Sequence, residues 1–423
     1  MRSTIPCASK NSLRWKPSGK VWRIVFSMTR GPAKPMSDAC ARFDHPERAF
    51  EAVHVAGTNG KGSACAMVEA MARASGRRVG LYTSPHLCRV AERIRVDGEP
   101  IADGALTDVL GRVLTGAPDL SFFEALTLAA FVAFREAGVE VGVVEVGLGG
   151  RLDATNVLER PRATAITRIA LDHADRLGPR LVDIAREKAG IAKPGVPMFV
   201  GPADADVRAA IDEVAAARGA TTFDAGDAGA AAIALQAHLA LPGAHQIDNA
   251  TIAVRLARAL GVPDAAVERG LRETRWPGRL ERIERPEGPY LLDAAHNPDG
   301  AEALARYLEA EPAHPADGRL PGPGRALVFG ALADKAWDAM IDRLSPLFPA
   351  GRVYVAPQGR APAAPEAIAA RRPGTVAASV PSACAAARAL AGAGEVVVAG
   401  SIFLVGEARA ELLDLPFDRF VAL

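Results

Sequence analysis

The sequence predicts an α/β fold in which strands and helices alternate through two successive domains, and three observations lead to this prediction. Short apolar runs such as "VHVA" alternate with segments of helical periodicity such as "SACAMVEAMARASG", an order typical of parallel sheets covered by helices. The valine-rich run "VEVGVVEVG" fits a strand that is buried on both faces. After the segment "RWPGRLERI", residues 275–283, the alternation begins again, which indicates a second and smaller domain.

Each expected element follows from such a local pattern. β-branched and apolar runs bounded by glycine or proline indicate strands, and apolar residues three and four apart indicate helices. We expect residues 37–278 to form the first domain and residues 279–423 the second. In the first domain the expected strands are 53–56, 78–84, 139–150 and 162–169, and the expected helices are 63–76, 127–138 and 181–191; in the second, strand–helix pairs are expected in 289–309, 326–344 and 395–412, with a further strand at 352–357.

The composition fits an ordinary globular protein and excludes several classes. The chain of 423 residues is 49% hydrophobic and 23% charged, with a net charge of +1, so no basic excess indicates a nucleic-acid partner. No apolar run approaches the roughly 20 residues that a membrane helix needs. The five cysteines are scattered and form no C-x-x-C pair, which argues against a zinc cluster or a disulfide framework and favours the cytoplasm.

Residues 1–36 differ from the rest of the chain because they carry basic residues but no acidic residue. Their apolar patch, "VWRIVF", is short and interrupted by Arg23, so an export signal is not expected. We interpret the stretch as a disordered or mis-started leader, with Met28 and Met36 as alternative starts.

The stretch "AGTNGKGS", residues 56–63, joins an expected strand to an expected helix. It differs from the pattern G-x-x-x-x-G-K-[ST], because Gly57 lies two residues too close to Gly60 and because Gly62 separates Lys61 from Ser63. Glycines in such a turn let backbone N–H groups point inward around phosphate oxygens at the positive end of a helix. The loop predicts nucleotide binding, with Lys61 reaching the phosphates; a glycine-rich turn with a solvated lysine is the structural alternative.

Polar residues also follow the other expected strands. Ser84 follows the second strand, Glu145 ends the third, and Asp172 and His173 follow the fourth. Because ligands of open α/β sheets gather beyond the carboxyl ends of the strands, we expect these side chains near the loop. Oxygen ligands of this kind suit a magnesium ion that bridges nucleotide phosphates. A turn cap at Ser84, a solvated Glu145 and a structural His173 are the respective alternatives.

The motifs together resemble one protein family. "HVAGTNGKGS", "TSPHL", "VEVGLGGRLDATN", "LDHADRLG", "IAREKAGIAKPGVP", "GAHQIDNA", "WPGRLE", "LDAAHNPDG" and "VAGSIFLVGEAR" occur in the order seen in folylpolyglutamate synthases and dihydrofolate synthases, which are Mur-type ATP-dependent ligases. The resemblance covers residues 53–423, and the loop resembles the G-T-x-G-K-G-[ST] form of these enzymes. It implies a P-loop-type ATPase domain followed by a Rossmann-like domain.

The resemblance also implies a role for individual residues. Lys61, His173 and Lys188 would be catalytic, and Lys188 matches a lysine that is carbamylated in the family. ATP would be held by Thr58, Asn59, Gly60, Lys61, Gly62, Ser63, Asn249, Arg279, Asp293 and His296; two magnesium ions by Ser84, Glu145, His173 and Lys188; and the pteroate by Ser121, Phe122, Phe123, Glu124, Leu152, Asp153 and Ala154.

The implied reaction is ATP-dependent addition of L-glutamate to dihydropteroate and to the glutamate tail of reduced folates, through an acyl phosphate. The family further suggests a monomer with small-molecule substrates and no nucleic-acid or membrane partner. A Mur-type ligase for another carboxylate and an inactive ATP-binding homologue are the alternatives. Arg168 stands where the family usually has asparagine, and we expect it to lie away from the core chemistry.

Overall fold

The computed structural model describes residues 12–15, 22–25, 36–310, 324–358 and 361–418. Strands β1 (Ser12–Trp15) and β2 (Trp22–Val25) pair antiparallel. The rest of the expected leader, up to residue 35, lies outside the described residues, so its predicted disorder stays a prediction.

The first domain is built on an eight-stranded sheet with the order β10-β9-β8-β3-β7-β4-β5-β6. The six strands from β10 to β4 run parallel, whereas β5 and β6 continue the sheet antiparallel at one edge. The strands are β3 (Glu51–Ala56), β4 (Val79–Tyr82), β5 (Ile94–Val96), β6 (Glu99–Pro100), β7 (Val141–Glu145), β8 (Ala163–Ile166), β9 (Pro197–Val200) and β10 (Thr221–Asp224).

Helices cover both faces of this sheet, because successive strand side chains point to opposite sides. Val53 and Val55 of β3 pack in the cluster that holds α2, α8, α9 and α10, whereas Ala52 and Ala56 join the clusters of the opposite face. The helices are α1 (Met36–Arg42), α2 (Lys61–Ala74), α3 (Asp103–Gly116), α4 (Phe122–Glu136), α5 (Ala174–Leu177), α6 (Leu181–Ala189), α7 (Ala205–Ala217), α8 (Ala228–Gln236), α9 (His245–Ala259) and α10 (Asp264–Glu273), with single 3₁₀ turns η1 (Pro46–Arg48), η2 (Val90–Arg93) and η3 (Ala154–Val157).

The second domain has a six-stranded sheet of order β11-β12-β16-β13-β14-β15, parallel except for β11 at its edge. Two apolar clusters lie on its opposite faces, one with α11, α12 and α13 and the other with α14 and α15. Its elements are β11 (Glu281–Ile283), β12 (Tyr290–Asp293), α11 (Pro298–Ala310), β13 (Ala326–Phe329), α12 (Trp337–Leu344), η4 (Ser345–Leu347), β14 (Gly351–Tyr354), α13 (Pro365–Arg371), β15 (Thr375–Val376), α14 (Val380–Ala391), β16 (Val396–Ala399) and α15 (Ile402–Leu413).

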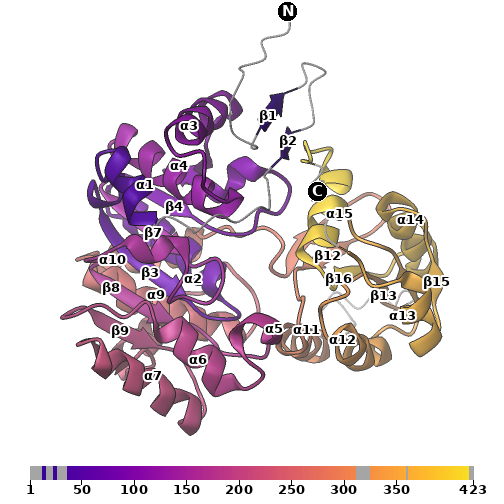
Figure 1. The fold of residues 1–423 in the computed structure, drawn as a ribbon. Helices are drawn as coiled ribbons and strands as arrows, with labels where there is room; N and C mark the ends of the chain where they lie inside the picture. The colour runs from indigo at the N-terminus through magenta and orange to yellow at the C-terminus, as the bar shows by residue number, and fades with distance from the viewer. Residues whose placement is uncertain (1–11, 16–21, 26–35, 311–323, 359–360, 419–423) are drawn as a thin grey trace, which may run out of the picture.

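The predicted fold class is confirmed: both domains are doubly wound α/β structures with mainly parallel sheets (Figure 1). The antiparallel edge strands β5, β6 and β11 were not anticipated, because their short runs carry little periodic signal. The residues between α10 and β11 connect the two lobes, and α5 of the first lies beside α11 of the second (Figure 1). Among the described residues, no helix has the length and apolar character needed to cross a bilayer.

Candidate functional site

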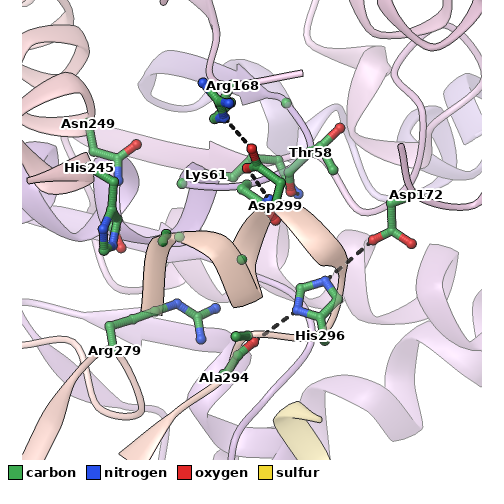
Figure 2. A pocket seen from close by; sticks show the side chains of 18 of the residues that line it. Thr58, Lys61, Arg168, Asp172, His245, Asn249, Arg279, Ala294, His296 and Asp299 are labelled. Atoms are coloured by element: carbon green, nitrogen blue, oxygen red, sulfur yellow. Dashed lines mark hydrogen bonds and ion pairs between the residues drawn. The ribbon is translucent and has the colours of Figure 1, made fainter. Parts of the chain in front are cut away.

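A cavity of about 480 Å³ lies where the two domains face each other, a volume within the range of small-molecule sites. Its walls come from the carboxyl ends of β3, β7 and β8 in the first domain and from the start of α11 in the second (Figure 2). All residues predicted for ATP and for metal line it: Thr58, Asn59, Gly60, Lys61, Gly62, Ser63, Ser84, Glu145, His173, Lys188, Asn249, Arg279, Asp293 and His296.

Residues 57–63, which we call the phosphate loop, join β3 to α2 in a shape that only glycine permits at two positions. Gly57 and Gly60 have positive φ angles of 147° and 89°. A Cβ atom would lie 1.8 Å from Thr167 Oγ1 at the first position and 2.0 Å from Asn249 Oδ1 at the second. The departure from the usual spacing therefore reflects a distinct and tightly packed loop.

Lys61 is the first residue of α2 and its side chain lies in the cavity. Its Nζ donates to Thr58 O at 3.1 Å and lies 3.9 Å from Glu145 Oε1. The free N–H groups at the start of a helix and this ammonium group both favour an anion. The loop can therefore hold phosphate groups with backbone and side-chain donors together.

Glu145, at the end of β7, is a buried carboxylate that faces the cavity. Its Oε2 accepts a hydrogen bond from the Ser84 backbone N–H at 3.1 Å. The carboxylate at the end of β7 therefore lies beside Ser84, which follows β4. Burial raises the pKa of Glu145, while Lys61 acts in the opposite direction. A divalent cation or the Lys61 ammonium can neutralise this charge.

Lys188, in the last turn of α6, is 5% exposed and also lines the cavity. Its Nζ donates to Gly57 O at 2.8 Å, which ties α6 to the phosphate loop. Burial, with a smaller contribution from Lys61, lowers the pKa of Lys188 to about 7. The amine is therefore partly neutral near pH 7, and a neutral amine is a nucleophile.

Asp172 is where charged groups from both domains converge. Its Oδ1 accepts from Lys335 Nζ at 2.5 Å, and its Oδ2 lies 3.4 Å from His296 Nε2 (the latter pair is drawn in Figure 2). Burial acts to raise the pKa of Asp172, but His296, Lys335 and His173 hold it well below its usual value. The carboxylate is thus ionised and links the two domains.

His173 follows Asp172 in a left-handed conformation at the start of α5. Burial lowers its pKa, so the imidazole is neutral near pH 7. Its Nε2 lies 3.3 Å from Lys335 Nζ. A cation held by His173 would therefore require Lys335 to move aside.

The described residues contain no group of three or more His, Cys, Asp and Glu side chains arranged for a metal ion. Glu145 and Ser84 supply oxygen donors on one wall, which fits a magnesium ion that keeps waters and shares ligands with phosphates. The oxygen donors of Ser84 and Glu145 therefore suit one magnesium ion.

In the second domain, Asp293 ends β12 and is held by two backbone donors. Its Oδ2 accepts from Leu280 N and its Oδ1 from Ala295 N, both at 3.0 Å. Burial raises the pKa of Asp293, and Arg279 and His245 oppose this. Asp293 thus shapes the wall on which Arg279 lies toward the cavity (Figure 2).

None of the seven residues predicted for the pteroate lines this cavity. Ser121 and Glu124 form a capping box at the start of α4, and Asp153 caps η3 while accepting from the N–H groups of Gly147 and Leu148. Phe123 packs so closely under Gly147 that a Cβ there would be 2.4 Å away. Since Gly147 and Leu148 do line the cavity, Phe123 and Asp153 lie directly behind its wall. The remaining members are Phe122, with Arg93 over its ring, the exposed Leu152 and the buried Ala154.

Three residues of the site were missed or misjudged from the sequence. Arg168 was expected away from the chemistry, but it lines the cavity and its Nε donates to Asp299 Oδ1 at 2.6 Å. Asn297 and Lys335 also contact residues of the cavity wall. The sequence signal that could have indicated these residues is that they follow strands β8, β12 and β13. The ends of these strands belong to two sheets that face each other.

Two family models match the chain. Residues 55–257 match the Mur ligase middle domain, and residues 278–402 match the glutamate ligase domain of Mur ligases. These ranges contain the phosphate loop, the Lys188 helix and both walls of the cavity.

Relatives with similar sequences carry consistent names. A Bacillus subtilis dihydrofolate synthase/folylpolyglutamate synthase is 34% identical, with 77% of this chain and 81% of the relative covered. A probable bifunctional folylpolyglutamate synthase/dihydropteroate synthase of Haloferax volcanii is 36% identical over 76% of this chain, but the chain spans only 41% of that protein's length.

Solved structures agree with these relatives. The Mycobacterium tuberculosis folylpolyglutamate synthase complexed with ADP and AMPPCP has a TM-score of 0.80 and 30% identity, covering 89% of this chain and 94% of that chain. A bifunctional folylpolyglutamate synthase/dihydrofolate synthase with Mn, AMPPNP and L-glutamate bound has a TM-score of 0.77 and 32% identity, covering 89% and 93%.

Proposed function

The chain belongs to the folylpolyglutamate synthase and dihydrofolate synthase family of Mur ligases, and on this premise we propose that it uses ATP to join L-glutamate to folates. The expected family and its reaction class, carbon–nitrogen bond formation, are confirmed. In the proposed activity, dihydropteroate gives dihydrofolate, and reduced folates are extended at their glutamate tail. The observation that carries the proposal is one cavity that unites a phosphate loop, the buried carboxylate of Glu145 and the buried amine of Lys188.

The phosphates of ATP are proposed to lie on the N–H groups of residues 60–63, with Lys61 on the outer phosphates. Phosphoryl transfer depends mainly on positioning and on neutralising charge, and the start of α2 supplies both. Asn249 from α9 and Arg279 from the second domain line the same cavity and complete the proposed nucleotide site.

ATP-dependent relatives with bound Mn support a divalent metal, and the oxygen donors of Ser84 and Glu145 fit one. When bound, such an ion neutralises phosphate charge and polarises the phosphorus being attacked. The second ion proposed from the family would involve His173 and Lys188.

Lys188 is proposed to carry a carbamate. Its neutral amine would attack CO₂, forming an N–C bond and releasing a proton, so that a cation becomes an anion with two oxygen donors. Support comes from its burial and from a pKa of about 7, which leaves the amine free to react. Without that change, the cavity would hold a second, partly protonated lysine beside Lys61.

The reaction would proceed in two steps. A carboxylate oxygen of the folate substrate attacks the γ-phosphorus of ATP, the bond to the bridging oxygen breaks, and an acyl phosphate and ADP result. The amine of L-glutamate then attacks the acyl carbon, inorganic phosphate leaves, and the amine loses a proton. No side chain acts as a nucleophile; the chain's contribution is to bind, to orient and to exclude water between the two domains.

The pteroate is proposed to lie beside the wall formed by Gly147 and Leu148. The exposed side chain of Leu152, 79% accessible, and the rings of Phe122 and Phe123 would offer apolar contacts to its aromatic part, with Ser121, Glu124, Asp153 and Ala154 around them. A monomer in the cytoplasm, with small-molecule substrates and no nucleic-acid or membrane partner, completes the proposal.

The test is glutamate-dependent ADP release by the full chain with magnesium and ATP. Dihydropteroate and tetrahydrofolate are offered separately, and the products are identified by mass. Activity with both substrates is expected. Activity with one alone would restrict the proposal to that branch, and nucleotide binding without any ADP release would overturn it.

The carbamate is tested by a second variant. We expect Lys188→Ala to lose turnover, and we expect added short carboxylates to restore part of it by occupying the vacated space. A variant with wild-type turnover would contradict the role of Lys188. Lys193→Ala is a matched control, because Lys193 also has a pKa lowered by burial but donates to Asn156 O and does not line the cavity.

A further inference from the structure

Four polar side chains join the two domains at the phosphate loop, and we call this group the clamp. It consists of Asn59 and Arg168 in the first domain and Asn297 and Asp299 in the second. Asn59 Nδ2 donates to Asn297 Oδ1 at 3.1 Å and to Asp299 Oδ2 at 2.8 Å, and Asn297 Nδ2 donates to Asn59 Oδ1 at 2.9 Å. Arg168 Nε donates to the other oxygen of Asp299 at 2.6 Å (drawn in Figure 2). Every one of these bonds crosses from one domain to the other.

The amide of Asn297 has only one orientation that satisfies its surroundings. The Gly300 backbone N–H donates to Asn297 Oδ1 at 2.9 Å, which identifies that atom as the oxygen. Its two amide hydrogens are directed to Asn59 and to Asp172, and Asn297 is 2% exposed. A buried amide with all its donors and acceptors used fits a single arrangement of its partners, so it selects one relative position of the domains.

Asn59 belongs to the phosphate loop, yet its side chain is bonded to the second domain. Its backbone stays in the first domain, because Thr167 Oγ1 donates to Asn59 O at 2.7 Å and Asn59 N donates to Arg168 O. Its neighbours Gly60 and Lys61 are those that would meet phosphate. The same short loop is therefore in contact with the nucleotide position on one side and with the second domain on the other.

We propose that Asn59 is a positioning residue that docks the second domain onto the phosphate loop, so that domain closure depends on the conformation of that loop. The clamp brings the start of α11, with His296, against the wall that carries Asp172. Asn59 acts through this docking and does not contact the reacting atoms. Its consequence for turnover rests on the proposed function, but the docking itself does not.

The test uses the full chain at saturating ADP with magnesium, with solution X-ray scattering as the readout. Asn59→Asp places a carboxylate against Asp299, so we expect a shift to a larger radius of gyration. In the double variant Asn59→Asp/Asp299→Asn the contact with residue 299 is restored with donor and acceptor exchanged, whereas the donation to Asn297 Oδ1 is still lost, so we expect the radius of gyration to return part of the way to the wild-type value. Asp338→Asn is the matched control, since Asp338 is an acidic first-turn residue of α12 that is exposed.

Scattering of Asn59→Asp identical to that of the wild type would overturn the proposal, as would a double variant that stays as expanded as the single one. Turnover gives a second readout: kcat should fall roughly a hundredfold through misplaced groups, and the double variant should recover part of that loss. A wild type that closes through the clamp but forms no ADP with any folate would refute the proposed function and leave the clamp standing.

Discussion

Among the contacts between the two domains, two regions differ in chemistry, and the difference indicates how the cleft opens. One is the clamp at the phosphate loop. The other, which we call the hinge contact, joins Leu87, Cys88 and Val90 of the first domain to Gly406 and Asp418 of the second. The clamp joins charged and amide side chains to one another, whereas every hydrogen bond of the hinge contact involves a backbone atom and apolar packing accompanies these bonds.

The two surfaces at the hinge contact are packed so closely that no further atom fits between them. A Cβ atom at Gly406 would lie 1.9 Å from Leu87 O, and the side chain of Leu87 packs against the core cluster of the second domain. Cys88 Sγ donates to Gly406 O at 3.3 Å, and Asp418 bonds the backbone of Val90 and Cys88. Such contacts persist only while both surfaces stay in register.

The clamp has a different character, because its ion pair is partly open to water although Asn297 is buried. Arg168 is 56% exposed at its side chain and Asp299 22%, and pairs this accessible contribute little to stability. We infer that the domains rotate about the hinge contact and separate at the clamp, which would admit substrates beside the phosphate loop.

The largest effect is expected from Gly406→Ala at the hinge contact. The new methyl group has no space, so we expect a loss of about 3 kcal/mol or more in the free energy of unfolding. The matched control is Gly111→Ala in α3, another helical glycine, whose Cβ would meet nothing within 4 Å. That change should stabilise by about 0.5–1 kcal/mol. Denaturant unfolding compares the two, and equal effects would refute the tight hinge contact.

Acid should weaken the first domain through a buried histidine. His54 of β3 is fully buried, its Nε2 donates to Thr155 Oγ1 at 2.8 Å, and burial lowers its pKa to about 3. Since the unfolded pKa lies near 6.5, stability is full above that value and falls as the unfolded chain takes up a proton. At pH 5 the loss is about 2 kcal/mol.

The control for this pH effect is His54→Gln, which keeps a donor toward Thr155 but cannot titrate. We expect the variant to flatten the dependence of unfolding free energy on pH between 7 and 5. Asp172 should stay ionised over that range, because its pKa is held below its usual value. An unchanged slope in the variant would assign the acid sensitivity to another group.

A smaller effect on stability is expected from Asp172→Asn at the cleft. Asp172 and Lys335 are each 8% exposed at the side chain, and removing one partner of a truly buried pair costs about 3–5 kcal/mol. Here the cleft can open and hydrate Lys335, so we expect less than about 1 kcal/mol. A loss in the larger range, measured by denaturant unfolding, would show that this side of the interface does not open.

The sequence was sufficient for the elements that carry a periodic signal. Val53–Ala56 and the helix that follows it were predicted close to their observed bounds. The valine-rich β7 was predicted as a strand because buried parallel strands are apolar throughout, but the predicted range 139–150 ran past its observed end at Glu145. The edge strands β5, β6 and β11 were missed because two or three residues carry no periodicity. The predicted domain boundary between residues 278 and 279 stays a prediction.

The residues of the candidate site fall into the same two groups: those that the sequence predicted and those that it did not. The phosphate loop and the strand-end residues Ser84, Glu145 and His173 were found because they follow strands of one sheet, whose edge is fixed by topology. The partners Arg168, Asn297 and Lys335 become visible only when two sheets face each other, and no local pattern encodes that arrangement. None of the residues expected around the pteroate lines the cavity, and their role stays a prediction.

The measurement that most directly tests the account is ADP formation by Lys61→Ala, compared with Lys193→Ala. Both lysines donate to a single backbone carbonyl, but only Lys61 lines the cavity. The account predicts that Lys61→Ala stays folded and forms no ADP in the presence of folate substrate and glutamate, while Lys193→Ala retains activity. Wild-type turnover in Lys61→Ala would contradict the assignment of residues 57–63 as the site of ATP.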